Sequence, residues 1–105
     1  MADFIPVARV SEIADPGKLV VACDDRMVIL FHVDGQFFCL DDICTHDGGP
    51  IGDGHLQDCE IVCRRHGSHF DIHNGKVLCM PATADIDSHE VRIEGENVLV
   101  RLRAK

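Results

Sequence analysis

The sequence of 105 residues contains no tryptophan and no tyrosine, so phenylalanine supplies all of its aromatic side chains. Basic residues are also scarce: ten Lys and Arg stand against eighteen Asp and Glu, a formal net charge of −8 with histidine neutral. A nucleic-acid-binding surface needs Lys and Arg against the phosphates, so this balance argues against nucleic acid as a partner. Such a charge keeps a domain soluble, and it equally steers a protein towards a basic partner surface.

Long apolar stretches are absent too, since no run approaches the roughly eighteen residues that a membrane-spanning helix needs. The first residues, Met1 to Phe4, lack the basic and apolar regions of a secretory signal. Six cysteines would suggest a disulfide framework only in a secreted chain. We therefore expect a cytoplasmic protein with reduced thiols and no membrane association. The sequence also has no phosphate-binding glycine loop and no convincing Ser–His–Asp pattern.

Short stretches of alternating or β-branched residues, separated by turn residues, recur along the chain and predict strands. These stretches cover residues 4–10, 18–23, 27–33, 36–40, 70–73, 76–78, 89–93 and 98–102. Pro6 is typical of an edge strand, and Asp34-Gly35 and Asn74-Gly75 are typical of type I′ hairpins. No stretch longer than one turn shows helical periodicity. The pattern predicts an all-β sandwich or small barrel in a single domain, residues 1–105.

The most informative stretch lies between residues 44 and 70. Cys44-Thr45-His46 opens it, and Cys63 is followed three residues later by His66. Two thiolates and two imidazoles are a complete tetrahedral set for zinc, and equally the ligands of a [2Fe–2S] centre with two histidines on one iron. Structural zinc hairpins usually pair like with like, whereas each hairpin here mixes Cys with His. Mixed hairpins favour a binuclear cluster, because each loop can give its cysteine to one iron and its histidine to the other.

Cys-Thr-His at 44–46, with Cys-x-x-His-Gly-Ser-x-Phe-Asp at 63–71, closely resembles the cluster motifs of the Rieske ferredoxin family. The resemblance covers most of the chain, because the flanking strands are similar to those of that family's small all-β domain. It implies an antiparallel Rieske-type sandwich or barrel with an inserted cluster-binding subdomain at about residues 41–83. It also implies one [2Fe–2S] cluster per chain, with these ligands: Cys44, His46, Cys63 and His66.

For function, the resemblance implies an electron carrier and not an enzyme. In this family, such domains carry single electrons from an NAD(P)H-dependent flavin reductase to the terminal non-haem iron oxygenase of a ring-hydroxylating system. The domain fills nearly the whole chain, which leaves no room for the mononuclear iron site of an oxygenase. Nothing in the sequence demands more than a monomer.

The resemblance also assigns roles to residues around the cluster. Five glycines are expected to let the loops bend and to bring backbone N–H groups towards the cluster sulfurs, namely Gly48, Gly49, Gly52, Gly54 and Gly67. Pro81 resembles the residue that covers the cluster in the family's third loop.

Two other functions stay open at this point. Residues 45–50 and 52–54 are similar to the first loop of small subunits of assimilatory nitrite reductases. Many members of that group lack cluster ligands, whereas this chain keeps all four. The other alternative is a zinc-stabilised interaction module, for which His55 is the alternative ligand because it lies between the two hairpins.

Four further cysteines lie on or beside apolar segments, and we expect them to be small buried side chains: Cys23, Cys39, Cys59 and Cys79. Five histidines lie outside the motif. Of these, His69 adjoins the second loop, and a surface or packing role is expected for it.

Differences from respiratory-chain Rieske proteins predict the reduction potential. Those proteins carry a disulfide between the cluster loops, where this chain has Gly49 and Arg65, and a tyrosine in place of Phe70, while Ser68 matches. Fewer hydrogen bonds to sulfur stabilise the reduced, more negative cluster less, and this lowers the potential. We expect a midpoint in the lower half of the Rieske range of about −150 to +300 mV, to be measured by redox titration. A value above about +200 mV would contradict the expectation.

Overall fold

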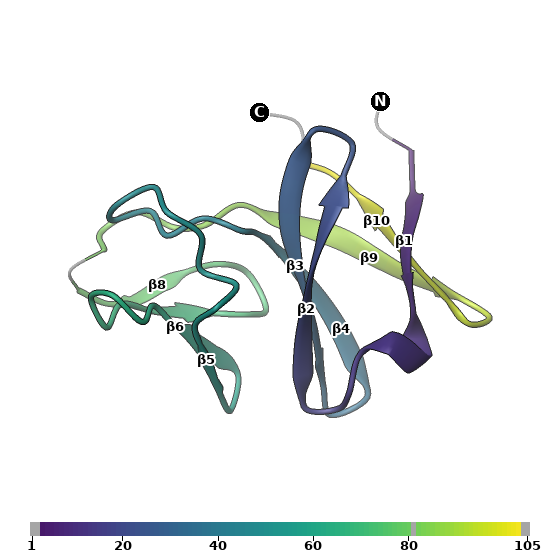
Figure 1. Ribbon diagram of the computed structural model, residues 1–105, viewed down its shortest axis with the longest axis horizontal. Coiled ribbons are helices and arrows are strands. Elements are labelled where there is room, and N and C mark those ends of the chain that lie inside the picture. Colours follow the sequence, from purple (N-terminus) through teal and green to yellow (C-terminus); the bar gives the residue numbers. More distant parts are fainter. Residues whose placement is uncertain (1–2, 81, 104–105) are drawn as a thin grey trace.

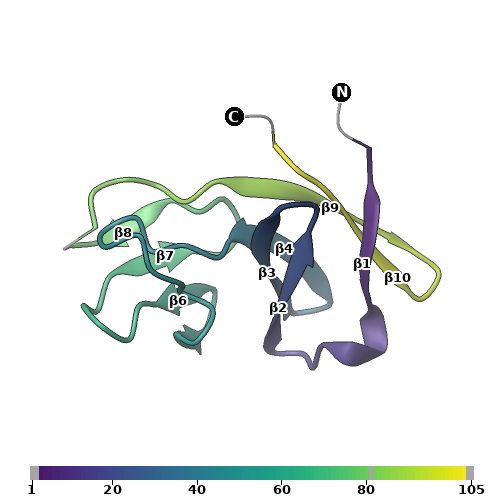
Figure 2. The same cartoon turned by 45° about the horizontal axis from the view of Figure 1, so that its top comes forward.

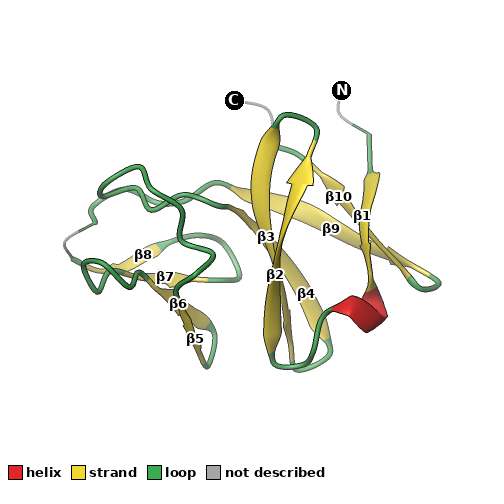
Figure 3. Cartoon of the chain, in the orientation of Figure 1, coloured by secondary structure: helices red, strands yellow, loops and turns green. Residues whose placement is uncertain are grey.

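The computed structural model describes residues 3–80 and 82–103. Within this range it is built of strands and one short 3-10 helix, shown in Figure 3. The elements are β1 (Ile5–Arg9), η1 (Val10–Glu12), β2 (Gly17–Cys23), β3 (Arg26–Val33), β4 (Gln36–Asp41), β5 (His55–Gln57), β6 (Glu60–Val62), β7 (His69–Asp71), β8 (Val77–Cys79), β9 (Ser88–Glu94) and β10 (Asn97–Arg101). Over the described residues, no helix is long and apolar enough to cross a membrane.

The strands form two antiparallel sheets, which lie side by side in Figure 1. The six-stranded sheet has the order β1-β10-β9-β4-β3-β2, and its edge strands β1 and β2 approach each other, so the sheet closes almost into a barrel. The four-stranded sheet follows the sequence order β5-β6-β7-β8. The expected all-β antiparallel fold is confirmed, and Pro6 lies on the edge strand β1 as predicted.

The smaller sheet belongs to a segment inserted between two neighbouring strands of the barrel. The chain leaves the barrel at the end of β4 and returns along β9, which pairs with β4 through Cys39–His89 and Leu40–Ser88. Figure 2 shows the segment that leads back into β9. Because the inserted segment leaves and re-enters the barrel between the paired strands β4 and β9, the barrel closes without it.

Strand β3 forms the wall between the barrel and the inserted segment. Successive side chains of a strand point to opposite faces. Val28 and Leu30 pack into the barrel core, whereas Ile29, Phe31 and Val33 pack into a second core shared with the inserted segment. This explains the unbroken apolar run of the strand: both of its faces are buried.

The turn predictions are confirmed at one hairpin and wrong at the other. Asp34 and Gly35 both have positive φ, 54° and 77°, as a type I′ turn requires. Between β7 and β8 the connection spans residues 72–76, and only Gly75 has a positive φ there. The longer loop forms because Asp71 bonds across it: its N–H donates to Lys76 O and its carbonyl accepts from Gly75. The short strands β5 and β6 were not predicted.

A polar network secures the point where the inserted segment leaves and returns. Asp41, at the end of β4, accepts hydrogen bonds from Arg26 at 2.6 Å and from buried His89 Nε2 at 2.7 Å. His89 Nδ1 accepts the backbone N–H of Arg103 at 2.9 Å, so the ring is fully bonded. Burial raises the pKa of Asp41, but the hydrogen bonds from Arg26 and His89 outweigh burial, and the pKa lies below its ordinary value of 3.8.

Asp41→Asn is expected to lower the free energy of unfolding at pH 7 by about 1.5–3 kcal/mol, because a charged hydrogen-bond acceptor is lost. A carboxyl group with a lowered folded-state pKa contributes stability above its unfolded pKa and loses it as the pH falls through the folded value. The difference from the wild type should therefore shrink below about pH 4. Urea unfolding between pH 2 and 7 measures it, and Asp25→Asn in the exposed β2–β3 turn is the control. An equal effect of the two substitutions would contradict the prediction.

Candidate metal centre

Two loops of the inserted segment begin with a predicted cysteine and have the same backbone turn. In each, the cysteine N–H donates to the carbonyl five residues ahead, and the glycine four residues ahead donates back to the cysteine carbonyl, at 2.7–2.9 Å. Both glycines have left-handed φ, 76° and 77°, which an L side chain rarely adopts. The residues are Cys44, Gly48 and Gly49 in the first loop and Cys63, Gly67 and Ser68 in the second.

The twin loops bring the four predicted residues together as two pairs. The Cys44 and Cys63 side chains are buried, and their thiols contact each other. The His46 and His66 rings meet edge to face, with their centroids 4.6 Å apart. The side chain of His66 is 40% exposed. The sulfur pair is thus buried, while the imidazole pair reaches the surface.

Burial, together with the neighbouring Cys63 thiol, raises the pKa of Cys44, so without a metal the thiol stays protonated. The backbone N–H groups of His46 and Asp47 are directed at its sulfur and act in the opposite sense. A bound metal ion replaces the proton of such a thiol. The site therefore has two thiols, buried from water and supported by N–H donors, that fit a metal cluster.

The five glycines, expected to let the loops bend, use their own N–H groups within the loops. All five donate to protein oxygens: Gly48 to Cys44 O, Gly49 to Asp47 Oδ1, Gly52 to Asp42 Oδ1, Gly54 to Ile51 O and Gly67 to Cys63 O. Their bonds shape the loops, and the donors nearest to the Cys44 sulfur come from His46 and Asp47. That the bent loops bring other backbone N–H groups to the cluster sulfurs stays a prediction.

A third segment, following β8, is tied to both loops. Ala82 N–H donates to Ser68 Oγ at 2.9 Å, and Thr45 Oγ1 donates to Ala84 O at 2.5 Å. Ser68 is fully buried, and accepting this bond leaves its hydroxyl hydrogen free for a further acceptor. That it donates to a cluster sulfide stays a prediction. Pro81, predicted to cover the cluster, lies outside the described residues.

An ion pair that the sequence reasoning missed joins the two loops. Arg65 donates from Nε to Asp47 Oδ2 at 2.6 Å and from Nη2 to Oδ1 at 3.2 Å. The hydrogen bonds from Arg65 and from the Gly49 N–H hold the pKa of Asp47 well below its ordinary value. The available signal was a pair of opposite charges, each beside a predicted histidine. All six cysteines are free, as expected from Gly49 and Arg65 at the disulfide positions.

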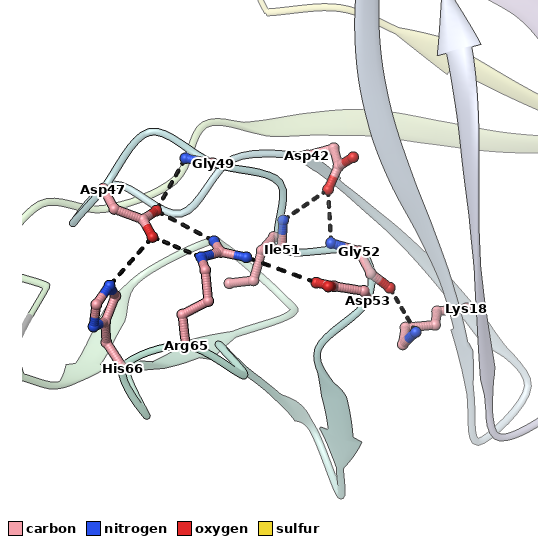
Figure 4. A network of polar contacts seen from close by, with 9 residues as sticks. All are labelled: Lys18, Asp42, Asp47, Gly49, Ile51, Gly52, Asp53, Arg65 and His66. Carbon is pink, nitrogen blue, oxygen red and sulfur yellow. Dashed lines mark hydrogen bonds and ion pairs between the residues drawn. The ribbon is translucent and has the colours of Figure 1, made fainter.

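Asp42 and Lys18 fix the far end of the first loop against the barrel (Figure 4). Asp42 Oδ1 accepts the N–H groups of Ile51 and Gly52 at 2.9 and 2.7 Å. Lys18 Nζ, on β2, donates to Gly52 O at 2.6 Å. These two side chains therefore fix the position of the first loop relative to the barrel strands.

The remaining predicted residues lie in several environments. Cys23 and Cys39 are buried as expected, whereas Cys59 is half-buried and Cys79 is exposed, so the expectation is wrong for the last. Cys79 is exposed because it ends the edge strand β8. His69 pairs with Glu60 through Nδ1 at 2.7 Å, which fits the expected surface role.

The arrangement of the candidate metal-binding side chains is relevant to the alternative of a zinc site. A structural zinc site gathers four side chains around one ion. Among residues 3–80 and 82–103, no three His, Cys, Asp or Glu side chains converge in this way. A binuclear cluster needs only two protein groups for each iron, and the structure presents a thiol pair and an imidazole pair. His55 is exposed on β5.

A small all-β barrel with paired thiols and imidazoles on twin loops fits a small iron–sulfur protein, and comparison with known proteins identifies the family. Residues 3–98 match the model of the Rieske [2Fe-2S] domain. The ferredoxin component of the naphthalene 1,2-dioxygenase system of Pseudomonas aeruginosa is 33% identical over 99 residues, 94% of this chain and 95% of that protein. The chain therefore belongs to the Rieske [2Fe–2S] family.

Solved structures agree. The ferredoxin of Sphingomonas yanoikuyae B1 superposes with a TM-score of 0.88 at 26% identity, over 96% of this chain and 100% of that one. A chain from the complex of reduced oxygenase and oxidised ferredoxin in carbazole 1,9a-dioxygenase gives a TM-score of 0.89 at 23% identity, over 97% of each chain. The protein carries a [2Fe–2S] cluster and is an electron carrier rather than an enzyme.

Gly67→Ala is expected to cost about 1–2 kcal/mol of stability, because an L residue is strained at φ +77°. It should also lower the iron content per chain, since Gly67 shapes the loop of Cys63 and His66. Gly35→Ala is a matched control with the same φ of +77° and no atom within 4 Å of the added Cβ. It should lose similar stability and keep its iron. Equal iron contents, measured alongside urea unfolding, would contradict the prediction.

Proposed function

We propose that Cys44 and Cys63 hold the inner iron of the cluster and that His46 and His66 hold the outer one. The observation that carries this proposal is the pairing itself: two buried thiols in contact and two imidazoles edge to face, on loops of identical turn. The proposal places the cluster-binding segment at about residues 41–83 of a single domain, residues 1–105.

Bound there, the cluster supplies a one-electron redox couple, with imidazole ligands raising its potential above that of all-cysteine ferredoxins. The residues around it control access. The thiol pair is 0–1% exposed and keeps water from the sulfur side. The half-exposed ring of His66 forms a short route to the surface, so electrons enter and leave by the imidazole edge.

We further propose that the protein accepts electrons from an NAD(P)H-dependent flavin reductase and delivers them to a terminal non-haem iron oxygenase. The named relatives support the oxygenase partner: one is the ferredoxin component of a dioxygenase system, and another comes from a complex of oxygenase and ferredoxin. The reductase is what the family resemblance implies. These names favour this function over a nitrite reductase subunit. None of the six cysteines is in a disulfide, which fits a cytoplasmic location, and we propose that the protein acts there as a monomer.

The surface beside the imidazoles suits contact with a partner. Leu78 and Met80, at the end of β8, are 51% and 74% exposed. Strand β8 pairs with β7, which follows directly on the second cluster loop. Two exposed apolar side chains on a chain with a net charge of −8 fit a partner surface that combines apolar and basic residues.

Absorption and electron paramagnetic resonance spectra of the dithionite-reduced protein test the proposal. A brown protein with a rhombic signal of low average g is expected. Cys44→Ser, Cys63→Ser, His46→Ala and His66→Ala should each lose the signal. The controls Cys79→Ser and His55→Ala are exposed residues of the same types and should keep it.

The same reduced protein, mixed without oxygen with a terminal ring-hydroxylating oxygenase, should be reoxidised in a single exponential phase that slows at high salt. A colourless protein that binds zinc would contradict the ligand assignment. A brown protein that does not reduce the oxygenase, or is not reduced by a flavin reductase with NADH, would contradict the assignment of partners.

A further inference from the structure

The polar contacts between the cluster loops centre on one carboxylate, Asp47, which follows His46 directly (Figure 4). Its Oδ1 accepts the Gly49 N–H at 2.9 Å and Arg65 Nη2 at 3.2 Å. Its Oδ2 accepts Arg65 Nε at 2.6 Å. The side chain is 25% exposed, and these three hydrogen bonds set its orientation.

Asp47 Oδ2 also faces His66, the second histidine of the site. His66 Nε2 lies 3.3 Å from Asp47 Oδ2, the atom to which Arg65 Nε donates. Nε2 thus faces the carboxylate, and Nδ1 is the ring nitrogen on the other side, available for iron. Arg65 Nε and His66 Nε2 both approach Asp47 Oδ2, and each weakens the interaction of the other with this oxygen.

We propose that Asp47 and Arg65 are positioning residues that tune the reduction potential in opposite directions through the ring of His66. This inference rests on the proposed function, in which His66 is a cluster ligand. Asp47 orients the ring and lowers the potential, whereas Arg65 limits this effect by drawing the carboxylate to itself.

The opposite signs follow from fixed charges. A carboxylate at the outer nitrogen of a ligating imidazole makes the ring a stronger donor to the metal. A stronger donor stabilises the oxidised cluster over the reduced, more negative one, which lowers the potential. The guanidinium of Arg65 neutralises part of that charge, and its own positive charge favours the reduced cluster. Removing Asp47 should therefore raise the potential, and removing Arg65 should lower it.

The far side of the guanidinium supplies a control of matched charge. Asp53 Oδ1 lies 3.9 Å from Arg65 Nη1, and its side chain is 54% exposed. Asp53→Asn removes the same charge as Asp47→Asn in the same network, but it leaves the contact with His66 in place. A general effect of net charge would shift both variants equally.

The test is spectroelectrochemical measurement of the midpoint potential of the full-length, cluster-loaded protein and its variants at one pH and salt concentration. Asp47→Asn should shift the potential upwards by clearly more than Asp53→Asn. Arg65→Gln should shift it downwards, and Arg65→Lys, which keeps the charge but loses the fork, should lie between Arg65→Gln and the wild type.

Shifts of the same sign in Asp47→Asn and Arg65→Gln would indicate general loosening of the loops and would overturn the inference. Equal shifts in Asp47→Asn and Asp53→Asn would overturn it as well. If Arg65→Gln loses its cluster during purification, the comparison of the two aspartate variants decides alone.

Failure of the proposed function gives a different result. A wild-type protein without the rhombic signal, or a His66→Ala variant that keeps it, removes His66 from the ligand set. A normal wild-type signal with an unchanged potential in both charge variants refutes only the role of Asp47 and Arg65. No partner protein enters the measurement, so the choice of reductase or oxygenase does not affect it.

Discussion

The double burial of β3 is the constraint on which both parts of the molecule depend. Val28 and Leu30 complete the barrel core, while Ile29 and Phe31 complete the core beneath the cluster loops. Each such side chain contributes about 1.5–3 kcal/mol when fully buried. A slip by one residue in the pairing of β3 would exchange the two sets of side chains and empty both cores. The hairpin at Asp34-Gly35 fixes that register, and with it the position of the core side chains beneath the cluster loops.

Above this core, the turn around each cysteine of the cluster loops is closed by backbone bonds. Each closes with two N–H to carbonyl bonds around its cysteine and a left-handed glycine. Ligand side chains on a turn that is already closed need little further ordering when a cluster binds, and such preorganisation favours tight binding. The histidine lies two residues after Cys44 but three after Cys63, so the imidazoles do not follow the symmetry of the turns. Their rings meet at 75° instead of stacking.

Much of this was predictable because the signals are local. Period-two alternation, Asp34-Gly35 and the two Cys-His spacings each lie within a few residues, and they predicted the sheet, one hairpin and the four candidate ligands. What failed depends on contacts distant in sequence or on side chains that compete with the backbone. In the Asn74-Gly75 loop, the Asp71 carboxylate accepts the N–H of His73 at 2.9 Å. Strands β5 and β6 are too short to show alternation. The ion pair of Asp47 with Arg65 joins residues that only the closed loops bring together.

That ion pair includes Arg65, one of the two positions that match the loop disulfide of respiratory-chain Rieske proteins. The other position, Gly49, lies beside the pair, since a Cβ on Gly49 would be 3.1 Å from Arg65 Nη2. A disulfide joins loops covalently but persists only in an oxidising compartment. A bidentate Arg–carboxylate pair connects the loops without requiring an oxidising compartment. An exposed pair of this kind is weak and is screened by salt. It differs from a disulfide in one further respect: it places two charges beside His66, so the contact that joins the loops also acts on the electronic properties of a proposed ligand.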